Sequence, residues 1–455
     1  MQDLVPKEYK ERNSLVINPV KTCQPIGAMY AALGIHGALP HSHGSQGCCS
    51  YHRMHLTKHF REPVVASSSS FTEGASVFGG RANLETALKN IFAVYDPEVV
   101  AINTTCLSET IGDDIGSIIN GFDVPAGKTI IHASTPSYVG SHITGFSNMV
   151  KAVIKQVSEK NEDAKTNNKI NLIPGFVDPG DIREIKRILE AMGIDYILFP
   201  DQSDVLDTPL DGSYDMYPEG GVTIPELKDT GNSQATIALG EFAASDPAFE
   251  LEKKHDVKPY TLKSPVGIKA TDEFLMQLMK LTGKEVPAEI EKERGQLVDI
   301  IADTHHQFHG KKVAVYGDPD IVISLTEFVL SLGMKPVHIL TGTPDKKFEE
   351  TVAEMMESAD WKYNLTAGGD LFQLHQWIKN DQVDLLLGNS YGKLVAKQED
   401  VPLVRVGFPI LDRSVHSYLP TIGYKGAILL VEKISGALLD RKDRDTDFEL
   451  IEFVL

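Results

Sequence analysis

Three cysteines in the first quarter of the chain lie in local contexts that suit metal binding. Cys106 follows the strand-like segment 98–105 and opens a helix-like segment, while Cys23 and Cys48 lie beside turns rich in proline or glycine. Exposed N–H groups at a helix N-terminus favour the thiolate, the form of cysteine that metals bind. The glycines before Cys48 let the backbone approach a bulky ligand. The three residues are therefore candidate thiolate ligands.

The spacing of these thiols argues against the common cysteine sites. They are 25 and 58 residues apart (48 − 23 and 106 − 48), and no cysteine follows Cys106. Zinc sites usually contain close pairs such as CxxC, and bacterial ferredoxins contain a tight cysteine run, but this sequence has neither. Three distant thiols instead fit half of a cluster site that a second subunit completes. The alternative is three buried apolar residues, the usual environment of an isolated cysteine.

A fourth cysteine, Cys49, directly follows Cys48. Two neighbouring side chains do not easily reach the same target, and a disulfide between them would be strained. A reducing compartment would also keep the four cysteines of this 455-residue chain as thiols. We therefore expect Cys48 to be the ligand and Cys49 to pack in the interior.

Composition indicates a globular protein of about three domains. Hydrophobic residues make up 42% of the chain, charged residues make up 24%, and the formal net charge is −19. This acidic balance argues against nucleic acid as a partner, because binding phosphates needs a basic surface. The sequence contains no apolar run long enough to cross a membrane and no hydrophobic signal segment at its N-terminus. We expect a cytoplasmic protein without a nucleic-acid or membrane partner.

Alternating strand-like and helix-like segments predict an α/β fold of three doubly wound domains with mainly parallel sheets. The strands are continuous apolar runs, which is typical of sheets covered on both faces. Strands are expected at 98–105, 128–134, 170–176, 195–201, 311–320, 335–343, 383–390 and 401–409, and helices at 181–193, 321–333, 371–380 and 424–442. We place the domains at 1–165, 166–305 and 306–455, the second with an irregular excursion at 202–236 and the third Rossmann-like. Neither GxGxxG after a strand nor GxxxxGK[ST] occurs, so these nucleotide sites are not expected.

Six motifs resemble, in the same order, the beta chains of nitrogenase molybdenum-iron proteins. The resemblance runs from about residue 15 to the end, and the chain is similar to the short form without a long N-terminal extension. It implies the fold of nitrogenase component 1. The motifs are KTCQPIGAMYAALG, HGSQGCCSYHR, FTEGASVFGG, TTCLSETIGDD, TPSYVGSHITGF and GNSYGK.

The resemblance implies a set of cluster ligands. In that family, the beta chain supplies half of the ligands of an eight-iron P-cluster, [8Fe-7S], at the interface with the alpha chain. The matching residues here are Cys23, Cys48 and Cys106, together with Ser137 in the TPS turn, whose oxygen binds iron in the oxidised cluster. The sequence departs from the family at Cys49, where an apolar residue is usual, and at His52, where an aromatic residue is common. Neither departure removes a ligand.

The resemblance also implies an oxidoreductase of nitrogen fixation that reduces dinitrogen to ammonia as an alpha2beta2 heterotetramer. Electrons would enter from a separate, ATP-hydrolysing iron protein and pass through the P-cluster. They would then reach an iron-molybdenum cofactor in the alpha chain. The beta chain is then an electron relay, and no catalytic acid or base is expected in it.

A second metal site is suggested by paired carboxylates. Asp299 and Asp303 are four residues apart, so they share one face of a predicted helix, and carboxylates suit hard cations. On the sequence alone, a solvated helix face is the more common explanation. In the resembling proteins, such aspartates bind a calcium or iron ion with the REP segment of the second beta chain. That segment is here the backbone carbonyl of Arg61 and the side chain of Glu62.

Several related or simpler proteins remain alternatives. One is an assembly scaffold that holds a cofactor precursor, and another is a light-independent protochlorophyllide reductase. The full set of three cysteines with Ser137 favours the nitrogenase complex over both. Vanadium and iron-only nitrogenases differ chiefly in the alpha chain, so this sequence leaves the active-site metal open. A structural protein with buried cysteines would contain no iron.

Overall fold

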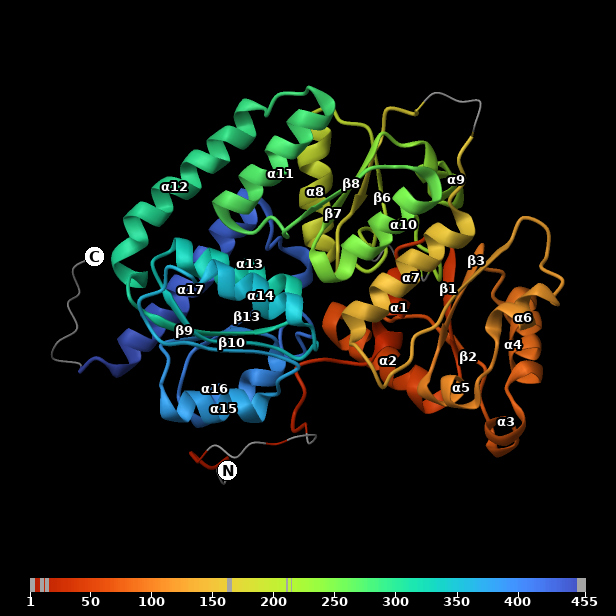
Figure 1. Cartoon of the computed structure of the whole chain (residues 1–455), viewed down its shortest axis with the longest axis horizontal. Helices are drawn as coiled ribbons and strands as arrows, with labels where there is room; N and C mark the ends of the chain where they lie inside the picture. The colour runs from red at the N-terminus through yellow and green to blue at the C-terminus, as the bar shows by residue number, and fades with distance from the viewer. Residues whose placement is uncertain are drawn as a thin grey trace.

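The computed structural model describes residues 5–8, 12, 16–161, 166–209, 212–213 and 215–447. Its described residues form three sheets in which every strand pairing is parallel. In Figure 1 the second sheet lies at the top, the third at the lower left and the first at the right. The predicted class, a doubly wound α/β fold with mainly parallel sheets, is confirmed.

Within each sheet, the strands lie side by side in the following order. The first sheet consists of β2 (Ser67–Ser68), β1 (Ala38–His43), β3 (Val99–Thr104) and β4 (Thr129–Ala133), the second of β6 (Tyr196–Leu198), β5 (Ile170–Ile173), β7 (Ala235–Leu239) and β8 (Pro259–Leu262), and the third of β11 (Asn364–Ala367), β10 (Lys335–Thr341), β9 (Lys312–Gly317), β12 (Leu385–Gly388) and β13 (Leu403–Arg405).

Helices connect the strands and cover the sheets. They are α1 (Gln24–Leu33), α2 (Gln46–Phe60), α3 (Glu73–Phe78), α4 (Arg81–Val94), α5 (Cys106–Ile111), α6 (Ile115–Asn120), α7 (His142–Val157), α8 (Pro179–Ala191), α9 (Ile224–Asp229), α10 (Asp246–His255), α11 (Gly267–Thr282), α12 (Ala288–Phe308), α13 (Pro319–Ser331), α14 (Lys346–Met355), α15 (Leu371–Asn380), α16 (Lys393–Gln398) and α17 (Gly423–Asp445), with short turns η1 (Thr230–Asn232), η2 (Glu241–Ser245), η3 (Ser390–Gly392) and η4 (His416–Tyr418). None of the described helices is long and apolar enough to cross a membrane.

The excursion predicted at 202–236 is wrong in its last third. Helix α9 occupies Ile224–Asp229 and β7 begins at Ala235. The helix starts there because the Thr223 hydroxyl accepts from the backbone of Glu226, whose carboxylate accepts in return from the backbone of Thr223. The capping-box pattern is present in the sequence, but the surrounding Asp and Gly residues favoured the prediction of an irregular segment.

The three sheets share their cores. One buried cluster joins Leu172 and Ile237 of the second sheet to Val313 and Val315 of the third. Another joins the first sheet and its helices to the opposite face of the second. The domain boundary predicted at 165/166 adjoins residues 162–165, which lie outside the described residues, and the one at 305/306 falls inside α12. Both boundaries stay predictions.

Helices α1 and α7 pack closely because each has a glycine at the contact. A Cβ atom added at Gly27 would overlap the carbonyl oxygen of His142, and one added at Gly145 would overlap the carbonyl oxygen of Gln24. The contact therefore needs a residue without a side chain on both helices. It fixes the start of α1, directly after Cys23, against the start of α7.

Replacing Gly145 by alanine is expected to destabilise this helix pair. The added methyl group must displace the backbone at Gln24, and overpacking of this kind costs about 1–3 kcal/mol. Gly436→Ala is the matched control, because Gly436 lies in α17 with no atom within 4 Å of an added Cβ. We expect a lower urea midpoint for Gly145→Ala and an equal or slightly higher one for Gly436→Ala. Equal urea midpoints for Gly145→Ala and the wild type would show that the contact between α1 and α7 tolerates a side chain at this position.

Candidate metal-cluster site

The three candidate ligands lie at helix N-termini around the first sheet. Cys23 is the N-cap residue of α1, Cys48 is the third residue of α2, and Cys106 is the first residue of α5. Strand β3 ends at Thr104, so the predicted position of Cys106 between a strand end and a helix start is confirmed. All three are half-buried, whereas Cys49 is buried.

Local sequence explains how the loops that carry Cys48 and Cys106 come together. Gly44 has a φ of +151°, and a Cβ there would overlap the hydroxyl of Thr105. The loop before α2 therefore packs directly on the N-cap of α5. Thr105 is held in turn by the Ser108 hydroxyl, which accepts from the backbone N–H of Thr105 at 3.0 Å. These contacts place the two cysteines on adjacent helix ends.

The predicted ligands meet in one place, which we call the thiol site (Cys23, Cys48, Cys106 and Ser137). Cys48 and Cys106 lie near each other and near Cys23: besides burial, Cys106 raises the pKa of the Cys48 thiol, and both raise the pKa of the Cys23 thiol. The Ser137 side chain lies close enough to Cys23 to offset a small part of the effect by which burial raises the pKa of that thiol. Residues that are 114 positions apart in the sequence (137 − 23) thus offer three sulfur atoms and one oxygen atom to a common volume.

Burial makes Cys23 and Cys48 hard to ionise without a cation. It raises the pKa of Cys23 to about 11 and also raises the pKa of Cys48 above its ordinary value. For these two thiols, burial outweighs the favourable position at a helix N-terminus. A metal that binds them must therefore replace two protons, and thiolate ligation compensates for that cost.

The thiol site opens toward the surface on the side of Cys23. A groove of about 460 Å³ is lined there by Cys23, Tyr51, His55 and Tyr391, among other residues. Tyr51 is 59% exposed although it is aromatic. A donor set of three thiols and a hydroxyl, open on one side, suits a soft metal cluster whose remaining ligands come from elsewhere.

Cys49 faces away from the thiol site. Its thiol donates to the carbonyl oxygen of Ser67 at 3.3 Å, and the residue is only 5% exposed. This placement agrees with the expectation that Cys49 packs in the interior.

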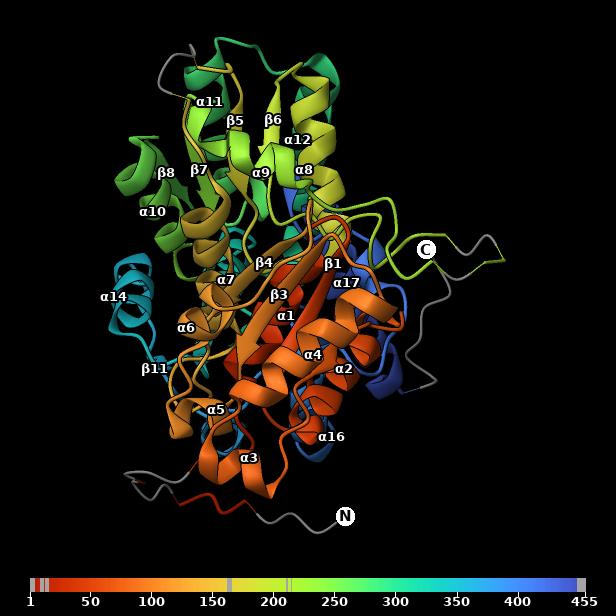
Figure 2. The same cartoon turned by 90° about the vertical axis from the view of Figure 1, so that its right-hand side faces the viewer.

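The residues of the second predicted metal site lie in separate parts of the chain. Asp299 and Asp303 are exposed, one turn apart on α12. Arg61 ends α2 in a left-handed conformation with a φ of 64°, and Glu62 follows it. Figures 1 and 2 both show α2 and α12 well apart. One chain therefore does not bring the four residues together, and a joint site would need two chains.

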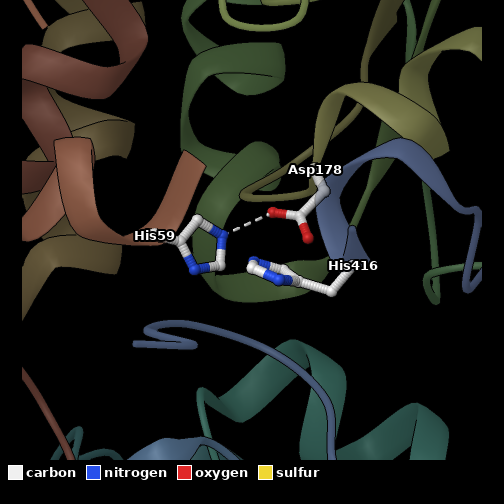
Figure 3. Close-up of side chains that lie close together, drawn as sticks. All are labelled: His59, Asp178 and His416. Atoms are coloured by element: carbon white, nitrogen blue, oxygen red, sulfur yellow. Dashed lines mark hydrogen bonds and ion pairs between the residues drawn. The ribbon is translucent and has the colours of Figure 1, made fainter. Parts of the chain in front are cut away.

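Sequence reasoning missed a group formed by His59, Asp178 and His416 (Figure 3). One possible ligand atom from each lies within 4.8 Å of the others. The Nε2 atom of His59 is 2.8 Å from the Asp178 carboxylate, and its Nδ1 atom accepts from the N–H of Ile410 at 2.8 Å. Because Nδ1 accepts, the proton is on Nε2 and is donated to Asp178.

This proton assignment argues against a metal ion between the three residues. A cation bound to Nε2 of His59 would have to replace the proton there. Because Nδ1 faces the N–H of Ile410 and carries no proton either, the ring would then be an imidazolate anion. The hydrogen bonds instead connect α2, the N-cap of α8 and the segment after β13, which belong to the three different sheets. The histidines near Cys48 are dense in the sequence, but nothing local distinguishes His59 from the others.

The fold and the thiol site together define a class: a three-sheet α/β protein that presents convergent thiols for a metal cluster at the edge of its first sheet. The family model described as nitrogenase component 1 type oxidoreductase matches residues 23–439. The chain belongs to this family.

Curated relatives and solved structures agree with this assignment. The nitrogenase molybdenum-iron protein beta chain of Clostridium pasteurianum is 56% identical over 99% of this chain and 100% of the relative. The corresponding chain of Azotobacter vinelandii is 41% identical over 97% of this chain and 88% of the relative.

A chain of the solved structure of nitrogenase Cp1 at pH 6.5 is 56% identical and superposes with a TM-score of 0.98, with both chains covered completely. A chain of nitrogenase Cp1 at pH 5 superposes with a TM-score of 0.74 at 16% identity, over 96% of this chain and 92% of that chain. This second likeness shows the same fold alone.

Removing the His59 ring should weaken the junction of the three sheets. His59→Ala removes one partner of the Asp178 carboxylate and leaves the buried Ile410 N–H unsatisfied, and an unsatisfied buried group costs about 1–3 kcal/mol. We expect a clearly lower urea midpoint. His306→Ala, on the exposed face of α12, is the control and should stay within about 0.5 kcal/mol of the wild type. Equal losses in the two variants would contradict the role of His59.

Proposed function

We propose that this chain is the beta subunit of a nitrogenase molybdenum-iron protein and relays electrons through an iron–sulfur cluster bound at the thiol site. The cluster is the eight-iron P-cluster, shared with an alpha chain in an alpha2beta2 assembly. A transient ATP-hydrolysing iron protein delivers electrons, and the alpha chain holds the iron-molybdenum cofactor where dinitrogen is reduced to ammonia. The observation that carries the proposal is the convergence of Cys23, Cys48, Cys106 and Ser137 beside an open groove.

The number and type of donors favour a shared iron–sulfur cluster. Cysteine thiolates are the usual ligands of such clusters, and a complete single-chain site normally uses four. This chain offers three thiols within its thiol site, and its remaining cysteine, Cys49, is buried and directed at Ser67. The missing ligands have to come from a partner that occupies the open side. An alpha chain in contact with the groove beside Cys23 meets this requirement.

Each residue of the site has a defined task. The three thiolates bind iron, and their helix N-termini offset part of the added negative charge. The Ser137 hydroxyl, next to Cys23, supplies a harder oxygen donor that suits more oxidised iron. The half-buried position limits the access of water to the sulfur atoms. When bound, an iron–sulfur cluster supplies one-electron transfer. No acid or base for dinitrogen reduction is assigned to this chain.

Replacing Cys48 tests the cluster proposal, and its neighbour Cys49 provides a matched control. In the assembled protein, Cys48→Ala removes a ligand and should deplete cluster iron, together with its electron paramagnetic resonance signal. Cys49→Ala removes a buried thiol without a role in ligation and should keep both. Iron analysis and spectroscopy of the two purified assemblies check the result. Full iron in Cys48→Ala, or the same loss in both variants, would contradict the proposal.

We also propose that two beta chains share a calcium or iron ion. Asp299 and Asp303 of one chain would bind it together with the Arg61 carbonyl and the Glu62 carboxylate of the other. The support is the exposed pair of carboxylates on α12 and the separation of α12 from α2 within one chain, which Figures 1 and 2 show. Burial raises the pKa of Glu62, and a bound cation would favour its ionised form.

Neutralising Asp303 tests this second site. Asp303→Asn should lower the amount of calcium or non-cluster iron that remains with the purified assembly, because one charged ligand is lost. Glu291→Gln, an exposed acid near the start of the same helix, is the control and should have no effect. Elemental analysis after gel filtration measures the difference. An unchanged metal content in Asp303→Asn would contradict the assignment.

A further inference from the structure

We propose that His52 is a positioning residue of the thiol site, whose Nε2–H donates a hydrogen bond to the Cys23 sulfur and raises the reduction potential of the cluster bound there. The inference rests on the proposed cluster function. It assigns to His52, which is not a ligand, control over the electronic properties of one ligand.

The geometry of α2 brings His52 to the thiol site. His52 is four residues after Cys48, so both side chains project from the same face of the helix. The Nε2 atom lies 3.2 Å from the Sγ atom of Cys23, a hydrogen-bonding distance for sulfur. The histidine is 4% exposed, so water does not compete for this contact.

The surroundings of the ring decide which nitrogen carries the proton. Nδ1 of His52 is buried and has no hydrogen-bond partner among the described residues. A proton on Nδ1 would leave a buried N–H donor unsatisfied and turn the lone pair of Nε2 toward the sulfur. A proton on Nε2 gives the donor an acceptor and leaves only an acceptor atom unpaired, which is the less costly arrangement. The ring therefore donates to Cys23.

A hydrogen bond to a ligating thiolate favours the reduced state of a cluster. Reduction adds negative charge to the iron and sulfur atoms, and an N–H dipole directed at a sulfur stabilises that charge. The effect is strong in a site shielded from water, because the effective dielectric constant is low. His52 is therefore expected to hold the cluster potential at a more positive value than an apolar aromatic side chain of similar size would.

Two substitutions separate hydrogen bonding from packing. His52→Phe keeps a planar ring and removes the donor. His52→Gln keeps an N–H group at about the position of Nε2 and loses the ring. A role in hydrogen bonding predicts a more negative potential for His52→Phe and a potential near the wild type for His52→Gln. If His52 acts through packing alone, the potential should shift more in His52→Gln, which loses the ring, than in His52→Phe, or by the same amount in both.

The experiment is a redox titration of the cluster in the assembled protein, with iron content measured on the same samples. A negative shift in His52→Phe at full iron content, largely absent in His52→Gln, supports the proposal. An unchanged potential in His52→Phe, or equal shifts in the two variants, overturns it. A wild-type assembly without cluster iron would instead overturn the proposed function itself.

A spectroscopic measurement covers the case in which His52→Phe loses its iron. In wild-type protein with isotopically labelled histidine, pulsed electron paramagnetic resonance of the oxidised cluster should detect a weakly coupled histidine nitrogen. His52→Gln should lack this coupling while it keeps the cluster. The absence of a histidine coupling in the wild type would overturn the hydrogen bond.

Discussion

The close contact between α1 and α7, possible only because Gly27 and Gly145 lack side chains, is the constraint on which the site depends. Cys23 precedes α1, and Ser137 belongs to the segment before α7, so their proximity needs the two helix starts to be adjacent. A similar restriction acts where Gly44 meets Thr105 and sets Cys48 beside Cys106. These two glycine contacts hold Cys23 near Ser137 and Cys48 near Cys106.

The same arrangement explains why the site is both protected and open. Parallel strands end at one edge of a sheet, and ligands of such folds gather beyond those ends. Here that edge carries the thiols, which burial keeps largely away from water. The groove beside Cys23 leaves one side accessible to a partner. Under the proposed function, electron transfer benefits from the protection, and a cluster shared with a partner requires the opening.

Much of the fold could be predicted from local patterns, as the individual elements show. Segment 371–380 coincides with α15, because Asp370 caps the helix and the apolar spacing is regular. Strand β1 was not predicted, since it is buried on both faces and its buried residues include His41, Ser42 and His43. The structure satisfies these groups with partners such as Ser69, which hydrogen-bonds to both histidines at 2.8 Å. No pattern of apolar residues reveals such a strand.

The candidate site could be predicted only in part, because local sequence does not show which distant residues meet. Cysteines at strand ends and turns are local features, and their context and spacing suggested a shared half-site. Their actual meeting depends on sheet topology, and only the resemblance to a family supplied Ser137 and the type of cluster. His59, Asp178 and His416 are spread over 357 positions (416 − 59) and have no local signal at all. The contact between His52 and Cys23 also requires coordinates, although the spacing of His52 from Cys48 on one helix face was available in the sequence.

We propose that this chain holds half of a cluster site that a partner completes. The most direct measurement is the iron content of the chain after anaerobic purification from its native host, with and without its partner chain. We expect a brown assembly that contains iron and molybdenum, and a lone chain with little cluster iron. A native assembly without iron, or a lone chain that retains the complete cluster, would contradict it.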